Sequence, residues 1–275
     1  MLAKKSLGQN FLTSRSAIDT IVSSGNVTPA DTVLEVGPGK GALTEALLEK
    51  AGKVIAVEKD DRLIPLLEEK FSAEKKASRF ELIHADALEF EPGTAGLAAG
   101  KYKLIANIPY YITGAFLRRF LGHAAAPSLM VLLVQKEVAE RAVARDGKES
   151  ILSLSIKAYG TPRFVQTVKA GSFSPAPNVD SAILSIESIS KSYFADFSEE
   201  FYFDAIKAAF AGKRKMLRGT LKSWLEKKGI ANAEITEKLS RIWSERAFPE
   251  KIRAEDIPFE QWQPFLKLLS ETFPD

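Results

Sequence analysis

Cysteine is absent from this sequence of 275 residues, and histidine occurs only twice, at His84 and His123. Without cysteine there can be no disulfide bond, no thiolate zinc site and no cysteine nucleophile. Two histidines leave little for a metal cluster or for a relay that uses imidazole as its base. We therefore expect any chemistry to depend on carboxylates, amides, backbone groups and aromatic rings, with no bound metal ion.

Long apolar runs are also missing. No segment approaches the roughly 18 to 20 uncharged residues that a membrane helix needs, and the N-terminus lacks the apolar core of a signal peptide. Hydrophobic residues make up 45% of the chain and charged residues 27%, without repeats or low-complexity tracts. We expect a folded, cytoplasmic, monomeric protein, whose net charge of +3 is too small to identify a polyanionic partner.

Short apolar runs alternate with segments of helix length through the first half of the chain. The runs lie at residues 32–36, 53–58, 80–86, 103–107 and 128–135. Strands spaced in this way pair in parallel through right-handed crossovers, which predicts an α/β fold with a doubly wound, mostly parallel sheet. Two later runs, 163–170 and 181–188, leave no room for a crossover helix and predict an antiparallel hairpin at the sheet edge. Ser14 is a favoured N-cap for a helix over residues 14–24.

The strand pattern ends near residue 190. Beyond it, apolar residues recur at helical spacing, as at Phe203, Ile206 and Phe210. We therefore predict two domains: a sheet domain over residues 1–190 and a small all-helical domain over residues 191–275.

A glycine-rich turn follows the first predicted strand. Gly37, Gly39 and Gly41 would let the backbone pass close to a ligand at the crevice above the strand ends. With Ala42 the turn matches a dinucleotide fingerprint, and the three glycines alone also fit the nucleoside-binding turn of S-adenosylmethionine enzymes. Glu58 ends the next strand, where an acid can accept hydrogen bonds from ribose hydroxyls. The pattern indicates an adenosine-containing ligand without choosing the cofactor, and a simple tight connection is the alternative.

Asp86 follows the third predicted strand in the same layer. An ionised carboxylate there could accept a hydrogen bond from the amino group of an adenine. It could equally be the N-cap of a helix, for which aspartate is a favoured residue. Both interpretations stay open at this point.

The fourth strand ends in the sequence Asn-Ile-Pro-Tyr, where a generic loop would use Gly, Ser or Asp. The side-chain carbonyl of Asn107 and the backbone carbonyl of Ile108 could accept the two N–H groups of an exocyclic amine, with Pro109 stiffening the turn. Tyr110 offers a flat face for a base taken out of its stack. An adenine amine is a poor nucleophile because its lone pair is delocalised into the ring, and two acceptors would favour a more localised geometry. This arrangement suits methyl transfer that relies on orientation and electrostatics.

A second aromatic residue, Phe173, precedes Pro175 and Pro177 in the loop of the predicted hairpin. Its ring could cover the other face of the same base. The alternative is that Phe173 anchors the hairpin to the hydrophobic core.

A basic stretch lies in the predicted helical domain. Residues 213–228 carry seven positive charges and one negative charge. Such a run is often only a solvated helix face, but in a chain that also has a pocket built for a base it would bind RNA phosphates. The predicted RNA contacts are Lys213, Arg214, Lys215, Arg218 and Lys222.

With these motifs collected, the chain resembles the ribosomal RNA adenine dimethyltransferases, and among them the KsgA family. The resemblance covers nearly the whole length and rests on these segments, in this order: GQNFL, EVGPGKGALT, AVEKD, ADAL, NIPY, FSPAPNVDS and FAGKRKMLRGTL. The last segment is similar to the small-subunit enzymes and not to the macrolide-resistance methyltransferases, which act on large-subunit rRNA.

The resemblance implies a class I methyltransferase sheet with a helical RNA-binding domain, and S-adenosylmethionine as the cofactor. It implies N6,N6-dimethylation of two adjacent adenosines in a hairpin loop near the 3′ end of 16S rRNA, within assembling small ribosomal subunits. Asn107, Tyr110 and Phe173 would be the catalytic residues, with the two rings sandwiching the target adenine. The implied cofactor contacts are Gln9, Asn10, Leu12, Gly37, Gly39, Glu58, Asp86 and Asn107.

Three positions depart from the family pattern. Ala85 stands where Gly is frequent, Tyr111 where Asn is frequent, and Asn178 where Lys is frequent. These changes leave the predicted reacting groups in place but alter the packing beneath the base pocket and one phosphate contact. Two other functions stay open: an NAD-dependent oxidoreductase, for which the Asn-Ile-Pro-Tyr turn supplies no proton-transfer group, and a non-catalytic RNA-binding or ribosome-assembly factor.

Overall fold

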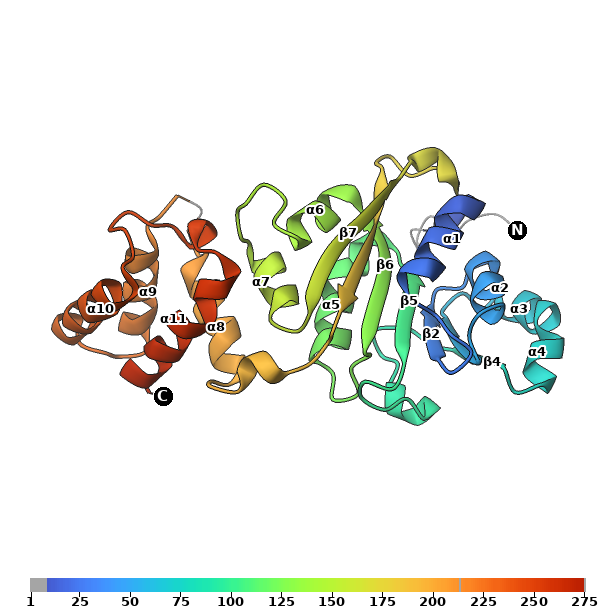
Figure 1. Cartoon of the computed structure of the whole chain (residues 1–275), viewed down its shortest axis with the longest axis horizontal. Coiled ribbons are helices and arrows are strands. Elements are labelled where there is room, and N and C mark those ends of the chain that lie inside the picture. The colour runs from blue at the N-terminus through green and yellow to red at the C-terminus, as the bar shows by residue number, and fades with distance from the viewer. Residues whose placement is uncertain (1–8, 213, 275) are drawn as a thin grey trace. The chain divides into compact units, whose positions relative to one another are not determined.

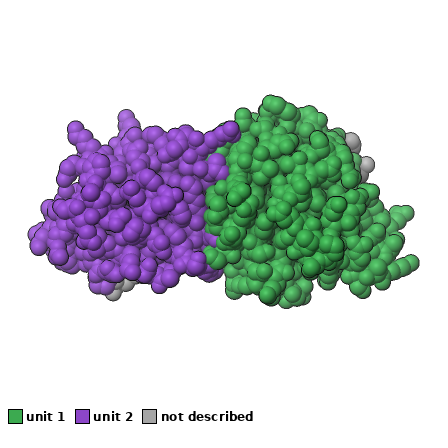
Figure 2. All heavy atoms as spheres, in the orientation of Figure 1, with its two compact units in different colours: residues 1–140, 160–190 green, residues 141–159, 191–275 purple. Residues whose placement is uncertain are grey.

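The computed structural model of the protein describes residues 9–212 and 214–274, and it divides the chain into two compact units. Unit 1 comprises residues 1–140 and 160–190, and unit 2 comprises residues 141–159 and 191–275 (Figure 2). The change of unit after residue 190 lies where the strand pattern of the sequence ends. Residues 141–159, however, were expected in the sheet domain and instead belong to unit 2.

Unit 1 is built on a seven-stranded sheet with the order β4-β3-β2-β5-β6-β9-β7 (Figure 1). Five strands run parallel to one another, and β9 is antiparallel to both β6 and β7. The strands are β2 (Thr32–Val36), β3 (Lys53–Glu58), β4 (Phe80–His84), β5 (Lys103–Asn107), β6 (Leu129–Gln135), β7 (Thr161–Val168) and β9 (Ser181–Glu187). The predicted α/β fold, with its parallel sheet and antiparallel edge hairpin, is confirmed.

The strand order reverses at β2, because the chain adds β3 and β4 on one side of it and β5 and β6 on the other. Crossovers on the two sides diverge there, so the carboxyl ends of β2 and β5 border a crevice, which is where open α/β sheets bind ligands. The buried runs of β2, β3 and β5 read as near-continuous apolar segments because both faces of the sheet are covered.

The helices of unit 1 lie mainly in the crossovers of this sheet. They are α1 (Arg15–Ser24), α2 (Ala42–Leu48), α3 (Ile64–Lys70), α4 (Ser72–Lys76) and α5 (Thr113–Gly122), and α6 (Lys136–Ala142) reaches the end of the first segment of the unit. Ser14 caps α1 as predicted, since its side chain accepts a hydrogen bond from the backbone N–H of Ala17. Ile18, Ile21 and Val22 bury the inner face of α1 in the core of the unit.

A second, two-stranded sheet joins the N-terminal segment to the hairpin loop. Strand β1 (Phe11–Leu12) pairs antiparallel with β8 (Phe173–Ser174). The sequence did not predict this pairing, because two-residue strands leave no periodic signal.

Unit 2 is helical, with α7 (Ile151–Lys157), α8 (Glu199–Ala209), α9 (Leu217–Lys227), α10 (Asn232–Arg246) and α11 (Phe259–Thr272). Its core is rich in aromatic side chains, including the fully buried Tyr202 and Trp262. Leu154 and Ala158 belong to the same core, and the Tyr202 hydroxyl donates to the backbone carbonyl of Leu154 at 2.9 Å. These contacts explain why residues 141–159 belong to unit 2, since the partner of a short amphipathic helix is set by distant residues.

Two absences hold for residues 9–212 and 214–274. None of their helices combines the length and the apolar character needed to cross a bilayer. They also contain no group of three or more His, Cys, Asp or Glu residues arranged to hold a metal ion.

Candidate active site

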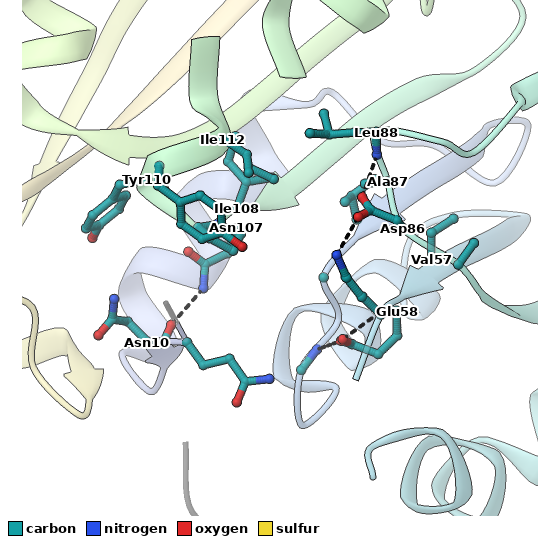
Figure 3. A pocket seen from close by; sticks show the side chains of 18 of the residues that line it. Asn10, Val57, Glu58, Asp86, Ala87, Leu88, Asn107, Ile108, Tyr110 and Ile112 are labelled. Atoms are coloured by element: carbon teal, nitrogen blue, oxygen red, sulfur yellow. Dashed lines mark hydrogen bonds and ion pairs between the residues drawn. The ribbon is translucent and has the colours of Figure 1, made fainter. Parts of the chain in front are cut away.

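A cavity of about 210 Å³ lies at the carboxyl ends of β2, β3 and β5 (Figure 3). An adjoining cavity of about 370 Å³ extends from the glycine turn towards the N-terminal segment. The first cavity brings together residues from five separate parts of unit 1. Among the residues predicted from the sequence, its walls contain Gln9, Asn10, Gly37, Gly39, Glu58, Asp86, Asn107 and Tyr110.

The glycine turn forms one wall of both cavities. Gly37, Gly39 and Gly41 all have positive φ angles, of 70°, 58° and 79°, which side chains other than glycine rarely adopt. A Cβ atom on Gly39 would also lie 2.9 Å from the Phe11 ring. Glycine is therefore required here both by the backbone conformation and by the close approach of the N-terminal segment.

Glu58 ends β3 at the floor of the first cavity and is only 6% exposed. One carboxylate oxygen accepts from the backbone N–H groups of Lys59 and Asp60, and the other accepts from Gly39 N–H at 3.2 Å. Burial raises the pKa of Glu58, and the three backbone donors oppose that shift. The carboxylate is thus fixed beside the glycine turn, with lone pairs left to accept ligand hydroxyls.

Asp86 lies after β4 on the neighbouring wall. One carboxylate oxygen accepts from Leu88 N–H at 2.9 Å, and the other forms a 2.5 Å ion pair with Lys59. The hydrogen bond from Lys59 lowers the pKa of Asp86, which keeps the group ionised and able only to accept. Residues 87–89 form a turn and not an α-helix, so the helix N-cap interpretation was wrong.

Asn107 ends β5 with its amide in a defined orientation. Its Nδ2 donates to the backbone carbonyl of Asn10 at 3.1 Å, as the dashed line in Figure 3 shows. The other end of the amide, Oδ1, has no hydrogen-bond partner among the described residues. The cavity wall therefore carries an oriented acceptor at this position.

Tyr110 lines the same cavity from the turn that follows β5. Its hydroxyl lies 2.6 Å from the Ser181 hydroxyl at the buried start of β9. Burial raises the pKa of Tyr110, so the phenol stays neutral and its ring is held by one end. Sequence reasoning missed Ser181, because only the three-dimensional fold brings β9 against this turn.

The N-terminal segment, residues 9–13, is fastened across the cavities at several points. Gln9 Nε2 donates to the buried carboxylate of Asp60 at 2.8 Å, and Thr13 N–H donates to Ser172 O at 2.8 Å. Leu12, predicted as a cofactor contact, lines the adjoining cavity rather than the first one. Phe11 lines both, and its ring lies under the Lys40 ammonium at 5.0 Å from the centroid.

Asp60 holds this segment and was not singled out from the sequence. Its carboxylate also accepts from Arg62, with an Nη2–Oδ2 distance of 2.5 Å. The hydrogen bond from Arg62 and the one from Gln9 lower the pKa of Asp60, which is 2% exposed. A buried carboxylate with this number of donors stays ionised and sets the position of Gln9.

Phe173 requires a correction. It is 5% exposed, belongs to the hydrophobic core of unit 1 and pairs with Leu12 through β8 and β1. It does not contribute to the walls of either cavity. The ring acts as the hydrophobic anchor that was the alternative interpretation, because its apolar surface is already covered by the core.

Glu35 is a further buried acid that the sequence did not reveal. It lies within β2, is 1% exposed and lines the adjoining cavity, and neither carboxylate oxygen has a hydrogen-bond partner. Burial raises the pKa of Glu35 to about 8 even though the nearby Thr44 hydroxyl, which falls short of hydrogen-bond geometry, acts in the opposite direction. An unpaired buried carboxyl group at a cavity wall is suited to a cationic ligand group, which would satisfy its oxygens.

The predicted RNA-binding cations belong to unit 2. Lys213 lies outside the described residues, whereas Arg214 and Lys215 are exposed and Lys222 is partly exposed, without a partner among the described residues. Arg218 differs, because its guanidinium reaches Glu250 at 3.4 Å, contacts the Ser240 hydroxyl and lies over the Trp243 ring. The predicted RNA contact at Arg218 therefore has partners within unit 2, since α10 packs against this face of α9 and binds the side chain.

Comparison with known proteins extends this picture. Residues 1–242 match the family model described as ribosomal RNA adenine dimethylase. A ribosomal RNA small subunit methyltransferase A from Dehalococcoides mccartyi is 42% identical over 261 residues, covering 95% of this chain and 86% of the relative. One from Clostridium botulinum is 35% identical over 232 residues, covering 83% of each chain.

Two solved structures share the fold over 95% of this chain. A dimethyladenosine transferase from Plasmodium falciparum superposes with a TM-score of 0.78 at 26% identity, over 96% of its own length. The 23S rRNA methyltransferase ErmE superposes with a TM-score of 0.73 at 25% identity, over its whole length. With the family match and these relatives, the chain belongs to the ribosomal RNA adenine dimethylase family.

Proposed function

We propose that this protein uses S-adenosylmethionine to dimethylate N6 of two adjacent adenosines in a hairpin loop near the 3′ end of 16S rRNA, in assembling small ribosomal subunits. The observation that carries the proposal is Asn107, whose amide is fixed by Asn10 so that an unpaired acceptor lines the cavity beside Tyr110. Membership of a dimethylase family removes the oxidoreductase and the purely non-catalytic alternatives.

The residues of the two cavities fit S-adenosylmethionine. Glu58 would accept the ribose hydroxyls and Asp86 the adenine amino group, because both carboxylates are held by backbone donors at the cavity wall. The unpaired carboxyl group of Glu35 suits the ammonium of the methionine part. When bound, this cofactor supplies an electrophilic methyl group on a sulfonium centre.

The chain orients the target amine without a covalent intermediate. Asn107 Oδ1 and the carbonyl of Ile108, both in the cavity wall, would accept the two N–H groups of the adenine amine. Accepting both hydrogens favours the more localised lone pair that attacks a methyl group. Tyr110, with its hydroxyl tied to Ser181, would hold the base by stacking. This is catalysis by orientation and fixed dipoles.

The same site can act twice on one adenine. After the first transfer the amine retains one N–H group, which one of the two acceptors can still bind. The ring of the base can keep the same contact during the second transfer, since stacking on Tyr110 does not involve N6. Each transfer breaks one S–CH₃ bond and releases one amine proton to solvent, so dimethylation requires that a second S-adenosylmethionine replace S-adenosylhomocysteine while the monomethylated base stays in place or rebinds.

One feature favours the small-subunit RNA as substrate, and a second is suited to RNA in general. The relatives cited above with 42% and 35% identity are both named small subunit methyltransferases. The exposed cations Arg214, Lys215 and Lys222 of unit 2 are suited to RNA phosphates, which position an RNA without reading its sequence. We propose the helical domain as the RNA-binding part of the protein.

A direct assay tests this function. Small subunits and large-subunit rRNA, both lacking adenine methylation, are incubated with the protein and S-adenosylmethionine, and the nucleosides are analysed by mass spectrometry. We expect N6,N6-dimethyladenosine in the small-subunit RNA alone, and loss of the product with Asn107→Ala. Methylation confined to the large-subunit RNA would move the substrate to the other ribosomal subunit.

A further inference from the structure

Tyr111 is an aromatic residue at the cavity that the proposed reaction does not use. It lines the first cavity, yet 67% of its surface is exposed, the largest value among the exposed large hydrophobic residues described. Its hydroxyl makes no hydrogen bond within the described residues. An exposed ring at the border of the cavity can contact the part of a bound molecule that extends out of the cavity.

The local backbone explains why two neighbouring tyrosines differ so strongly. Pro109, with φ of −58°, leads into the short 3-10 helix Tyr110–Ile112, which the Thr113 hydroxyl closes by donating to Tyr110 O. Tyr110 is tied to Ser181 within the fold, whereas Tyr111 points towards solvent. The turn therefore presents one ring inside the cavity and one at its rim.

A cation lies near this rim. Lys59 follows β3, and Tyr111 follows β5, so the two residues come from either side of β2 and its glycine turn. Lys59 is exposed, lines the same cavity as Tyr111 and forms an ion pair with Asp86. The rim thus combines an exposed aromatic ring with an ammonium group that Asp86 partly neutralises, and the ring is the kind of surface on which the bases of single-stranded nucleic acid stack.

We propose that Tyr111 stacks on the nucleotide next to the target adenine and so holds the RNA strand where it leaves the cavity. The inference rests on the proposed function, because it takes the occupant of the cavity to be a base within an RNA chain. Stacking on an aromatic ring tolerates every base, because each base has a flat face, so an adjacent adenine is a suitable neighbour.

The position of the ring favours the RNA over the cofactor as its partner. The groups suited to adenosine are deeper, since Glu58 is 6% exposed and the Asp86 side chain 26% exposed. The cofactor would end within the cavities, whereas an RNA strand must continue past the rim on both sides of a flipped base. The Tyr111 ring, two-thirds exposed at the rim, is therefore placed to contact the RNA strand.

The test combines protein variants with abasic RNA. Binding of a short RNA hairpin with two adjacent adenines is measured with S-adenosylhomocysteine present, so that no transfer occurs. Three RNAs are compared: the intact one, one with an abasic site 5′ of the target and one with an abasic site 3′ of it. We expect Tyr111→Ala to weaken binding of the intact RNA about tenfold, and to have no effect with one of the abasic RNAs. Tyr111→Phe should bind like the unchanged protein.

Control variants separate this effect from a general loss of structure. Val165→Ala removes an exposed apolar side chain on β7 that does not line the cavity, and should leave all three affinities unchanged. An equal loss with all three RNAs, or no loss with any, would overturn the proposal. So would a tenfold loss of cofactor affinity in Tyr111→Ala without RNA, because the ring would then belong to the cofactor site. If the unchanged protein methylates small subunits while these results are negative, only this inference fails.

Discussion

The cavity in unit 1 and the basic stretch in unit 2 hold their polar groups in opposite ways. In the cavity, Glu58, Asp86, Asn107 and Tyr110 are each oriented by a backbone or side-chain partner. In unit 2, Arg214, Lys215 and Lys222 have no partner among the described residues. Methyl transfer depends on the direction of each dipole, whereas attraction of a phosphate depends mainly on charge. The comparison teaches that a fixed group in the cavity should affect rate, and a free cation should affect affinity.

Asn107→Ala is expected to give the largest effect, because it removes an acceptor that acts as the amine reacts. The rate of methyl transfer should fall by about 10² to 10³, as when one oriented hydrogen-bonding group is lost from an active site. RNA affinity should stay within about twofold. Single-turnover kinetics with small subunits, together with a binding titration, measures both. Full activity would show that the Asn-Ile-Pro-Tyr turn is only structural.

Glu35→Gln is expected to change the pH dependence of stability. Folding raises the pKa of Glu35 from an ordinary value of 4.5 to about 8, so the folded state binds the proton more tightly. Stability from this group is complete below pH 4.5 and is lost as pH rises towards 8, by about 1.4 kcal/mol per pH unit. Thermal unfolding without cofactor at pH 5.5 and 7.5 should show a smaller decline in Glu35→Gln than in the unchanged protein. Equal declines would contradict the assignment of an unpaired carboxyl group.

The Gln9–Asp60 contact should control cofactor binding through the N-terminal segment. Gln9→Glu places a second negative charge against Asp60 and should weaken S-adenosylmethionine binding by about 1 to 3 kcal/mol, measured by calorimetry. Adding Asp60→Asn removes the repulsion and lets the new amide donate to the new carboxylate, an oppositely oriented hydrogen bond, although the Asp60–Arg62 ion pair is lost. Recovery of most of the affinity in the double variant is the expected result. A double variant weaker than both single variants would mean that Asp60 only supports the fold.

The strand pattern predicted much of the site because function in this fold lies directly after strand ends. Gly37, Glu58, Asp86 and Asn107 each follow or end a parallel strand, so the topology alone brings them to one edge of the sheet. These four residues could therefore be predicted without knowing any contact between side chains of distant segments.

The errors and omissions share a different cause. Glu35 lies inside a buried strand, where the sequence pattern indicates only burial. Ser181 and Asp60 act through partners 71 and 51 residues away. Phe173 was assigned to the target base although nothing in the sequence indicates what its ring packs against. Arg218 fits a basic helix stripe, but α10 supplies its partners. Pairings over such separations leave no periodicity in the sequence, so only the folded chain reveals them.

The smallest expected effect concerns the salt dependence of RNA affinity, which should differ between the unpaired cations and Arg218. Replacing Arg214, Lys215 and Lys222 together with Ala should flatten the slope of log affinity against log salt by up to about three, if each contacts a phosphate. Arg218→Ala should change this slope by less than one. It should instead lower the unfolding temperature, because the guanidinium lies against Trp243 and joins α9 to the Ser240 side chain of α10. Affinities for small-subunit RNA at several salt concentrations, with thermal unfolding of each variant, measure both quantities. A steep change of slope with Arg218→Ala and none with the triple variant would mean that the side chain leaves its partners in unit 2 to bind RNA.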